Sequence, residues 1–231
     1  MVSYRTLTLG IGVIALILIS GTLFMILTYK EPLADFGLAP DFTLKDENNE
    51  AVTLATYNSG ERVVVVDFIY TNCPDLTKCP LSSSMLKGVQ SALLDKGFTG
   101  LDFHLLSISF DWLNDGLDDM KNYSQKYGAD PSVWSFLWGN ESQIEHVTSA
   151  YGIFAGYPNV TSNLVSAADW GSTLTEIHNT RHENHTIMVH NMGLSIIDGS
   201  GHVRAKHTSV DWTIDLVVGQ VVQLIQETAD A

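Results

Sequence analysis

The chain of 231 residues is strongly acidic, because 26 Asp and Glu residues against 12 Lys and Arg give it a formal net charge of −14. Such a charge repels a phosphate backbone and argues against nucleic-acid binding. Only two cysteines are present, which excludes a small disulfide-stabilised scaffold. The length and a hydrophobic content of 45% are sufficient for one domain with a full core.

The first thirty residues differ from the rest, since every acidic residue lies at Glu31 or beyond. Residues 7–28 form an uncharged apolar run that, as a helix, would extend about 33 Å and cross a bilayer. The run is longer than the apolar part of a signal peptide, and no A-x-A-like cleavage site follows it, so an anchor is favoured over a cleaved signal. We expect residues 1–30 to be a single-pass anchor in the cell membrane with a cytoplasmic N-terminus, and residues 31–231 to be an extracytoplasmic domain.

The next part of the chain alternates predicted strands and helices. A linker at 31–40 leads into a hairpin at 40–54, and the β-branched run at 63–70 is typical of a strand buried on both faces. Apolar periodicity then predicts a helix at 82–96, a strand at 101–110, a helix at 117–127, a strand at 134–138 and a helix at 141–151.

The last third begins with a stretch at 155–185 that is rich in Gly, Asn, Ser and Thr and that we expect to be a long loop. Strands at 186–197 and 202–207 flank Asp198-Gly-Ser-Gly201, a typical hairpin turn, and an amphipathic helix at 214–228 follows. This order of elements predicts a layered α/β domain, with helices on both faces of a mixed sheet.

Both cysteines, Cys73 and Cys79, lie in one loop directly after the most apolar predicted strand. Each precedes a proline, and Pro80 stands at the expected first position of the next helix, where a missing N–H costs nothing. The dipole of a helix N-terminus favours the thiolate, which is the form that binds metals or attacks disulfides. The placement favours a functional pair over two inert cysteines or a structural disulfide.

The motifs around this loop resemble the Sco/SenC family of thioredoxin-fold proteins. They comprise Pro40-Asp-Phe-Thr-Leu44, VVVVDFIYTNCPD with a second Cys-Pro, Ile108-Ser-Phe-Asp111 and VHNMGLSIIDGSG, and the resemblance covers about residues 40–222. It implies a thioredoxin-like fold and a membrane-tethered protein that binds one copper ion and helps to assemble the CuA centre of cytochrome c oxidase. It also implies that Cys73 and Cys79 are copper ligands, that Asp75 is the acid common after the first Cys-Pro, and that Asp111 is the acid that ends the second core strand.

The chain departs from the family pattern at two places. The family usually has three residues between its cysteines, whereas five separate Cys73 from Cys79. On a helix a six-residue step turns by about 240° net, so these thiols cannot share a helix face and the loop must fold back to bring them together. The arginine that the family carries after the strand-end acid is absent, since Trp112 to Asn114 follow Asp111.

A histidine is expected to complete the site, because two thiolates and an imidazole form a soft trigonal set for Cu(I). His190 begins the strand that leads to the hairpin turn, where the family places its copper histidine; His185 is the alternative, about five residues farther from the turn. On one continuous strand Met188, His190 and Met192 would share a face, so a thioether could lie near the metal, although core packing is the simpler role for both methionines. His104 is expected to be a hydrogen-bonded structural histidine.

Two functions remain open. The first is a copper metallochaperone that holds one Cu(I) or Cu(II) ion by Cys73, Cys79 and His190 and delivers it to a CuA-bearing oxidase subunit or a similar cupredoxin acceptor. The second is a membrane-tethered thiol–disulfide oxidoreductase, in which Cys73 attacks and Cys79 resolves; the wide spacing weakens this alternative. A thiol peroxidase is a third and weaker alternative, because Thr71 stands one position too close to Cys73 for the Thr-x-x-Cys pattern. Copper delivery is the function that we expect.

Overall fold

The computed structural model describes residues 31–156 and 188–229. The chain divides into two units, residues 1–33 and 34–231, and the described helices and strands belong to the second. Within the described ranges, no helix has both the length and the apolar character needed to cross a membrane. The predicted anchor at 7–28 lies outside these ranges.

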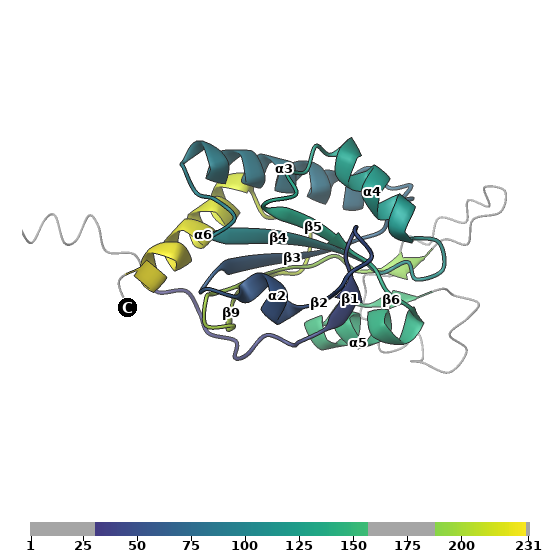
Figure 1. Cartoon of the computed structure of the whole chain (residues 1–231), viewed down its shortest axis with the longest axis horizontal. Coiled ribbons are helices and arrows are strands. Elements are labelled where there is room, and N and C mark those ends of the chain that lie inside the picture. Colours follow the sequence, from purple (N-terminus) through teal and green to yellow (C-terminus); the bar gives the residue numbers. More distant parts are fainter. Residues whose placement is uncertain (1–30, 157–187, 230–231) are drawn as a thin grey trace, which may run out of the picture. The chain divides into compact units, whose positions relative to one another are not determined.

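A five-stranded mixed sheet in the order β5-β4-β3-β8-β9 forms the centre of the second unit (Figure 1). Its parallel strands are β3 (Val63–Ile69), β4 (Phe103–Ser109) and β5 (Trp134–Leu137). On the other side of β3, β8 (Leu194–Ile197) pairs antiparallel with β3. β9 (Val203–His207) in turn pairs antiparallel with β8. Every residue of β3 and β4 is buried, as predicted for β3 from its continuous β-branched run and for β4 as a second core strand.

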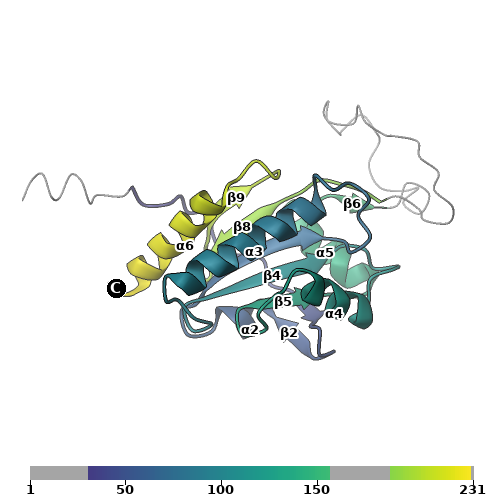
Figure 2. The ribbon, with the colours of Figure 1, turned by 90° about the horizontal axis from the view of Figure 1, so that it is seen from above.

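Helices cover both faces of this sheet, as predicted. On one face lie α3 (Cys79–Asp95), α4 (Leu117–Lys126) and α6 (Ile214–Ala229), and on the other lie α2 (Leu54–Asn58) and α5 (Glu141–Tyr151) (Figure 1). Viewed from above, α3 and α6 lie side by side across the sheet (Figure 2). The strands of the central sheet and the helices α3, α4, α5 and α6 follow one another in the predicted order.

A small hairpin precedes the main sheet, as predicted for 40–54. It consists of β1 (Thr43–Lys45) and β2 (Ala51–Thr53). The sequence did not predict α2, which follows at once and has only five residues. The backbone N–H of Thr53 donates to the hydroxyl of Thr56 at 3.0 Å, and this local bond stabilises a helical turn too short to show apolar periodicity.

The segment predicted as a linker at 31–40 is in fact bound to the sheet. The N–H of Phe36 donates to the carbonyl of Val203, and the N–H of Val203 donates to the carbonyl of Gly37, both at 2.9 Å. The linker prediction was therefore wrong for this part. The physical reason is that β9 is an edge strand, whose free N–H and C=O groups offer pairing that the sequence of the segment does not reveal.

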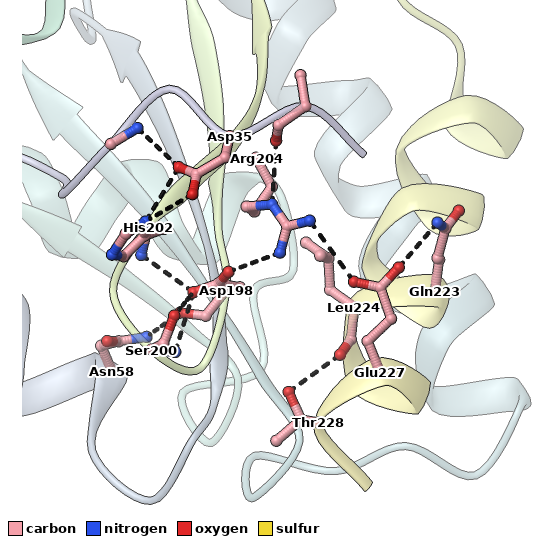
Figure 3. Close-up of polar contacts among 12 residues, drawn as sticks. Asp35, Asn58, Asp198, Ser200, His202, Arg204, Gln223, Leu224, Glu227 and Thr228 are labelled. Atoms are coloured by element: carbon pink, nitrogen blue, oxygen red, sulfur yellow. Dashed lines mark hydrogen bonds and ion pairs between the residues drawn. The ribbon is translucent and has the colours of Figure 1, made fainter. Parts of the chain in front are cut away.

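A polar network holds the same segment, the β8–β9 turn and α6 together (Figure 3). Arg204 donates to Asp198 at 2.9 Å, and its other terminal nitrogen lies 3.7 Å from Glu227 of α6. His202 lies 3.0 Å from Asp35. Since β8 runs antiparallel to β3, this network fixes the end of the sheet opposite to the cysteine loop.

The predicted strand at 186–197 is interrupted. β7 (Val189–His190) pairs with β6 (Ala155–Gly156), and only β8 joins the central sheet. Between them the side chain of Asn191 bonds to the backbone before β6, and a Cβ on Gly193 would lie 2.4 Å from an isoleucine side chain. Asn191 and Gly193 interrupt the predicted strand. Met188, His190 and Met192 were expected on one continuous strand and therefore do not lie on the same strand. The rest of the predicted loop, 157–185, lies outside the described residues.

Asp67 and His104 are titratable side chains that lie inside the core. Asp67 of β3 accepts a hydrogen bond from Ser82 at 3.0 Å, and burial raises the pKa of Asp67 to about 7. Burial, together with the charge of Arg62, lowers the pKa of His104 to about 3. His104 pairs with Ser135 through Nε2, but its buried Nδ1 has no partner among the described residues, so the expected hydrogen-bonded histidine is satisfied at one ring nitrogen only.

Candidate metal centre

The candidate site lies at the edge of the sheet where β3 and β4 end. The cysteine loop follows β3, and Phe110 follows β4 at the same edge because the two strands are parallel. β8 runs antiparallel to β3 with Leu194 opposite Asp67, so the residues that precede β8 also lie at this edge. The topology thus brings His190 to the cysteine loop, although the two lie far apart in the sequence.

Three side chains meet there. The ligand atoms of Cys73, Cys79 and His190 all lie within 4.8 Å of one another. Cys79 is fully buried, Cys73 is 9% exposed, His190 is half-buried, and the two cysteines are not joined by a disulfide. In a trigonal site with bonds of about 2.0–2.3 Å, ligand atoms lie about 3.5–4.0 Å apart, so shifts below about 1 Å let all three bind one ion. The set could therefore hold one metal ion, and its sulfur and nitrogen atoms suit a soft one.

The five residues between the cysteines fold back on Asp75, as their spacing requires. The carboxylate of Asp75 accepts from the N–H of Thr77 at 2.9 Å and from its hydroxyl at 2.6 Å, and these bonds lower the pKa of Asp75. The carbonyl of Asp75 accepts from the N–H of Lys78 at 3.1 Å, and the sulfur of Cys73 lies 3.6 Å from the same carbonyl. The longer loop is thus a compact turn that returns the chain to the site.

The two thiols differ in acidity. A hydrogen bond from Cys79, assisted by one from His190, holds the pKa of Cys73 well below its usual value, whereas burial raises the pKa of Cys79 well above it. The expectation that the helix N-terminus favours thiolates was wrong for Cys79. This residue begins α3, but its complete burial outweighs the dipole. Cys73 is therefore the more acidic thiol of the pair.

The imidazole of His190 is oriented before any metal binds. Its Nδ1 lies 3.0 Å from the carbonyl of Asn191, and because a carbonyl only accepts, Nδ1 donates this bond and leaves Nε2 as the nitrogen available to the thiol cluster. The ring of Phe110 lies 4.6 Å from the imidazole and that of Tyr70 lies 5.4 Å from it, measured between centroids. The sequence analysis did not identify these two aromatic residues. The available signal was their position directly after two parallel strands.

A third residue that the sequence analysis missed, Asp115, fixes the start of the cysteine loop. It accepts hydrogen bonds from the N–H of Thr71 at 2.9 Å, from the hydroxyl of Thr71 and from the hydroxyl of Ser109. Burial raises the pKa of Asp115 although these hydrogen bonds act in the opposite direction. Asp111, which the resemblance identified, accepts from Asn114 in its own turn at 3.0 Å. His185, the alternative third ligand, lies outside the described residues.

The mixed sheet, the helices on both faces and the thiol–imidazole cluster beyond a parallel strand define a thioredoxin-like protein with a candidate metal centre. The model of the SCO1/SenC family matches residues 31–226, and the chain belongs to this family. A comparison with curated proteins gave no match.

Solved structures share this fold at low sequence identity. A SCO1/SenC family lipoprotein from Bacillus anthracis is 18% identical, with a TM-score of 0.64 over 84% of this chain and 99% of its own. Arabidopsis thaliana ScoI with copper bound is 17% identical, with a TM-score of 0.61 over 82% of this chain and 99% of its own. BsSco, described as a cytochrome c oxidase assembly protein with a disulfide switch, is 19% identical, with a TM-score of 0.59 over 85% and 99%.

Proposed function

We propose that the protein is a membrane-anchored copper metallochaperone that delivers one copper ion to the CuA site of a cytochrome c oxidase-type subunit during assembly. The observation that carries the proposal is the cluster of Cys73, Cys79 and His190, whose ligand atoms lie within 4.8 Å of one another. Two thiolates and an imidazole suit Cu(I). The descriptions of the Arabidopsis protein as copper-bound and of BsSco as an oxidase assembly protein support the proposal.

The geometry suits uptake and release of the ion. Binding of Cu(I) requires both thiols to lose their protons, which is easier for Cys73, whose pKa is lowered, than for Cys79, whose pKa is raised by burial. Two thiolates and Cu(I) then carry a net charge of −1. The half-buried His190 is the most accessible of these three ligands. A ligand of the acceptor can therefore approach from that side and take the ion by ligand exchange.

The proposed location rests on the sequence. Residues 7–28 would cross the bilayer once, with the N-terminus in the cytoplasm and residues 31–231 outside, where the acceptor domain would be met. The description of the Bacillus anthracis relative as a lipoprotein supports a membrane-attached domain.

Thiol–disulfide exchange at the same cysteines is the second candidate. The low pKa of Cys73 favours it, because a thiolate is the attacking form, and Cys79 lies close enough to resolve a mixed disulfide. The substrate would be the cysteine pair of the acceptor subunit. The description of a disulfide switch in BsSco is compatible with this chemistry.

A copper titration tests the first proposal. Cu(I) and Cu(II) are added to the reduced full-length chain in detergent, and binding is followed by competition with a chromophoric chelator. We expect one ion per chain, and loss of tight binding in Cys73→Ser and His190→Ala. His146→Ala is the matched control, because His146 is an exposed histidine of α5 and its replacement should leave copper binding unchanged.

Transfer is then measured by mixing the copper-loaded chain with a metal-free CuA-domain subunit. Appearance of the CuA absorption bands supports delivery. Unchanged copper binding in His190→Ala would sink the assignment of His190. If no variant binds copper but the wild-type chain reduces a disulfide in the acceptor, thiol–disulfide exchange replaces copper delivery.

A further inference from the structure

Met192 lies inside the candidate metal centre. It follows His190 by two residues, is 7% exposed, and its Sδ lies 4.0 Å from the Sγ of Cys79. Met188 is buried to a similar degree but makes no such contact with either cysteine among the described residues. Of the two methionines near His190, only Met192 therefore presents its thioether to a thiol of the cluster.

The distance between the two sulfur atoms suits a shared metal ion. Two sulfur ligands with bonds of about 2.3 Å lie about 3.8–4.0 Å apart when the angle at the metal is tetrahedral to trigonal. The observed separation between Met192 and Cys79 is 4.0 Å. A metal ion bound to Cys79 on the side of Met192 would therefore meet the thioether with little movement of either residue.

Hydrogen bonds and close packing fix the backbone on both sides of Met192. On one side, Asn191 accepts a hydrogen bond from the N–H of Phe154 at 2.6 Å and donates one from its own N–H to the carbonyl of Phe154 at 3.0 Å. On the other side, Gly193 packs against Ile153 so closely that a Cβ would lie 2.4 Å from its Cδ1. Because both neighbours are fixed, the backbone at Met192 is already ordered before a metal binds, which lowers the entropic cost of binding.

A thioether would change the metal preference of the cluster. It is neutral and soft, so it adds a donor for Cu(I) without adding charge, and it contributes little to harder ions such as Zn²⁺ or Cu²⁺. Met192 would therefore favour the reduced ion over its competitors for the same thiolates.

We propose that Met192 is a fourth copper ligand, which joins Cys73, Cys79 and His190 and gives the site its preference for Cu(I). The inference rests on the copper function proposed above. The alternative role for Met192 is packing in the core, where it would fill space beside Cys79 without bonding to the metal.

Selenium labelling distinguishes these roles. The full-length chain, which has 6 methionines, is produced with selenomethionine, loaded with Cu(I) in detergent and studied by X-ray absorption at the copper edge. We expect one selenium neighbour in the copper coordination shell. It should disappear in Met192→Leu and persist in Met188→Leu, the matched control from the same segment.

Competition titrations provide the second readout. Met192→Leu should weaken Cu(I) binding by about tenfold or more, a loss that even second-layer substitutions at metal sites produce, and should leave the affinities for Cu(II) and Zn(II) unchanged. A copper shell of sulfur and nitrogen alone in the labelled wild-type chain overturns the role of Met192 and leaves the copper function standing. If the wild-type chain binds no copper, the proposed function fails, and the role of Met192 fails with it.

Discussion

Asp115 connects the cysteine loop to the neighbouring strand through one carboxylate. Its hydrogen bonds reach the first residue of the loop, Thr71, and Ser109 at the end of β4, which lies beside β3. A buried carboxylate that accepts several hydrogen bonds contributes more than a neutral acceptor would. The position of Cys73 therefore depends on a residue that touches neither sulfur.

Removal of this carboxylate should loosen the loop. Asp115→Ala leaves the N–H of Thr71 and two hydroxyl groups without their acceptor in a buried place, which costs about 2–3 kcal/mol of unfolding free energy. Copper affinity should fall as well, because the start of the loop is no longer fixed. Urea unfolding and a copper competition titration measure the two effects.

The control for this prediction is Asp95→Asn. Asp95 is an exposed acid at the C-terminal end of α3, where a negative charge gains nothing from the helix dipole. Its replacement should leave stability within about 0.5 kcal/mol of the wild-type chain. Equal stability of the Asp115→Ala and Asp95→Asn variants would show that the hydrogen bonds of Asp115 do not hold the loop.

The sequence identified the residues with distinctive chemistry and missed those that orient them. Cys73, Cys79 and His190 were recognisable because thiols and imidazoles are rare and carry metal chemistry. Asp115 and Phe110 have no such signal, since an acid or an aromatic residue after a strand has many ordinary roles. Their contributions depend on distances across the sheet, which only the fold defines.

Among the secondary-structure elements, the β8–β9 hairpin passes very close to the backbone of another segment. A Cβ on Gly199 would lie 2.3 Å from the carbonyl oxygen of Glu61 and 2.8 Å from its Cα. Because these atoms belong to the backbone, no side-chain rotation can make room. The turn is thus glycine-dependent for steric reasons.

Gly199→Ala should therefore destabilise the protein by about 1–3 kcal/mol, the usual range for overpacking. The free energy of unfolding in urea provides the measurement. Gly219→Ala is the matched control, because Gly219 is exposed in α6 with no atom within 4 Å of an added Cβ. That variant should gain about 0.5–1 kcal/mol from helix propensity. A Gly199→Ala variant as stable as the wild-type chain would contradict the close approach to Glu61.

The accuracy of the element predictions follows the strength of the periodic signal. The strands β3 and β4 and the helices α3 and α6 carry long apolar patterns, so their type and order were predictable. The break before β8 could not be predicted, because Asn191 and Gly193 act through contacts with a segment that is distant in the sequence. The attachment of the predicted linker to β9 depends in the same way on an edge that exists only in the folded sheet.

For the molecule as a whole, two buried groups make opposite contributions to the pH dependence of stability. Asp67 has its pKa raised from 3.8 to about 7, so the stability it contributes is complete below pH 3.8 and is lost as the pH rises towards 7. His104 has its pKa lowered from 6.5 to about 3, so its contribution is complete above pH 6.5 and is lost as the pH falls towards 3. Between pH 3.8 and 6.5, Asp67 makes the free energy of unfolding fall with rising pH, whereas His104 makes it rise.

Single replacements should separate these slopes. Relative to the wild-type chain, His104→Gln should lose unfolding free energy as the pH rises through this interval, because Asp67 then acts alone. Asp67→Asn should instead gain unfolding free energy over the same interval. In each variant the free energy of unfolding should change by at most about 1.4 kcal/mol per pH unit. Urea unfolding at several pH values measures this change. Parallel profiles in the two variants would show that these groups do not titrate as their burial requires.

The antiparallel pairing of β8 with β3 also determines when the metal centre becomes complete. Both cysteines belong to the part of the chain that is synthesised first, whereas His190 arrives with the segment that leads into β8. A partly synthesised or partly unfolded chain, in which β8 has not paired with β3, therefore presents the two thiols without His190 beside them. The three candidate ligands come together only after β8 has paired with β3, so a metal ion bound by all three would select chains whose sheet has closed.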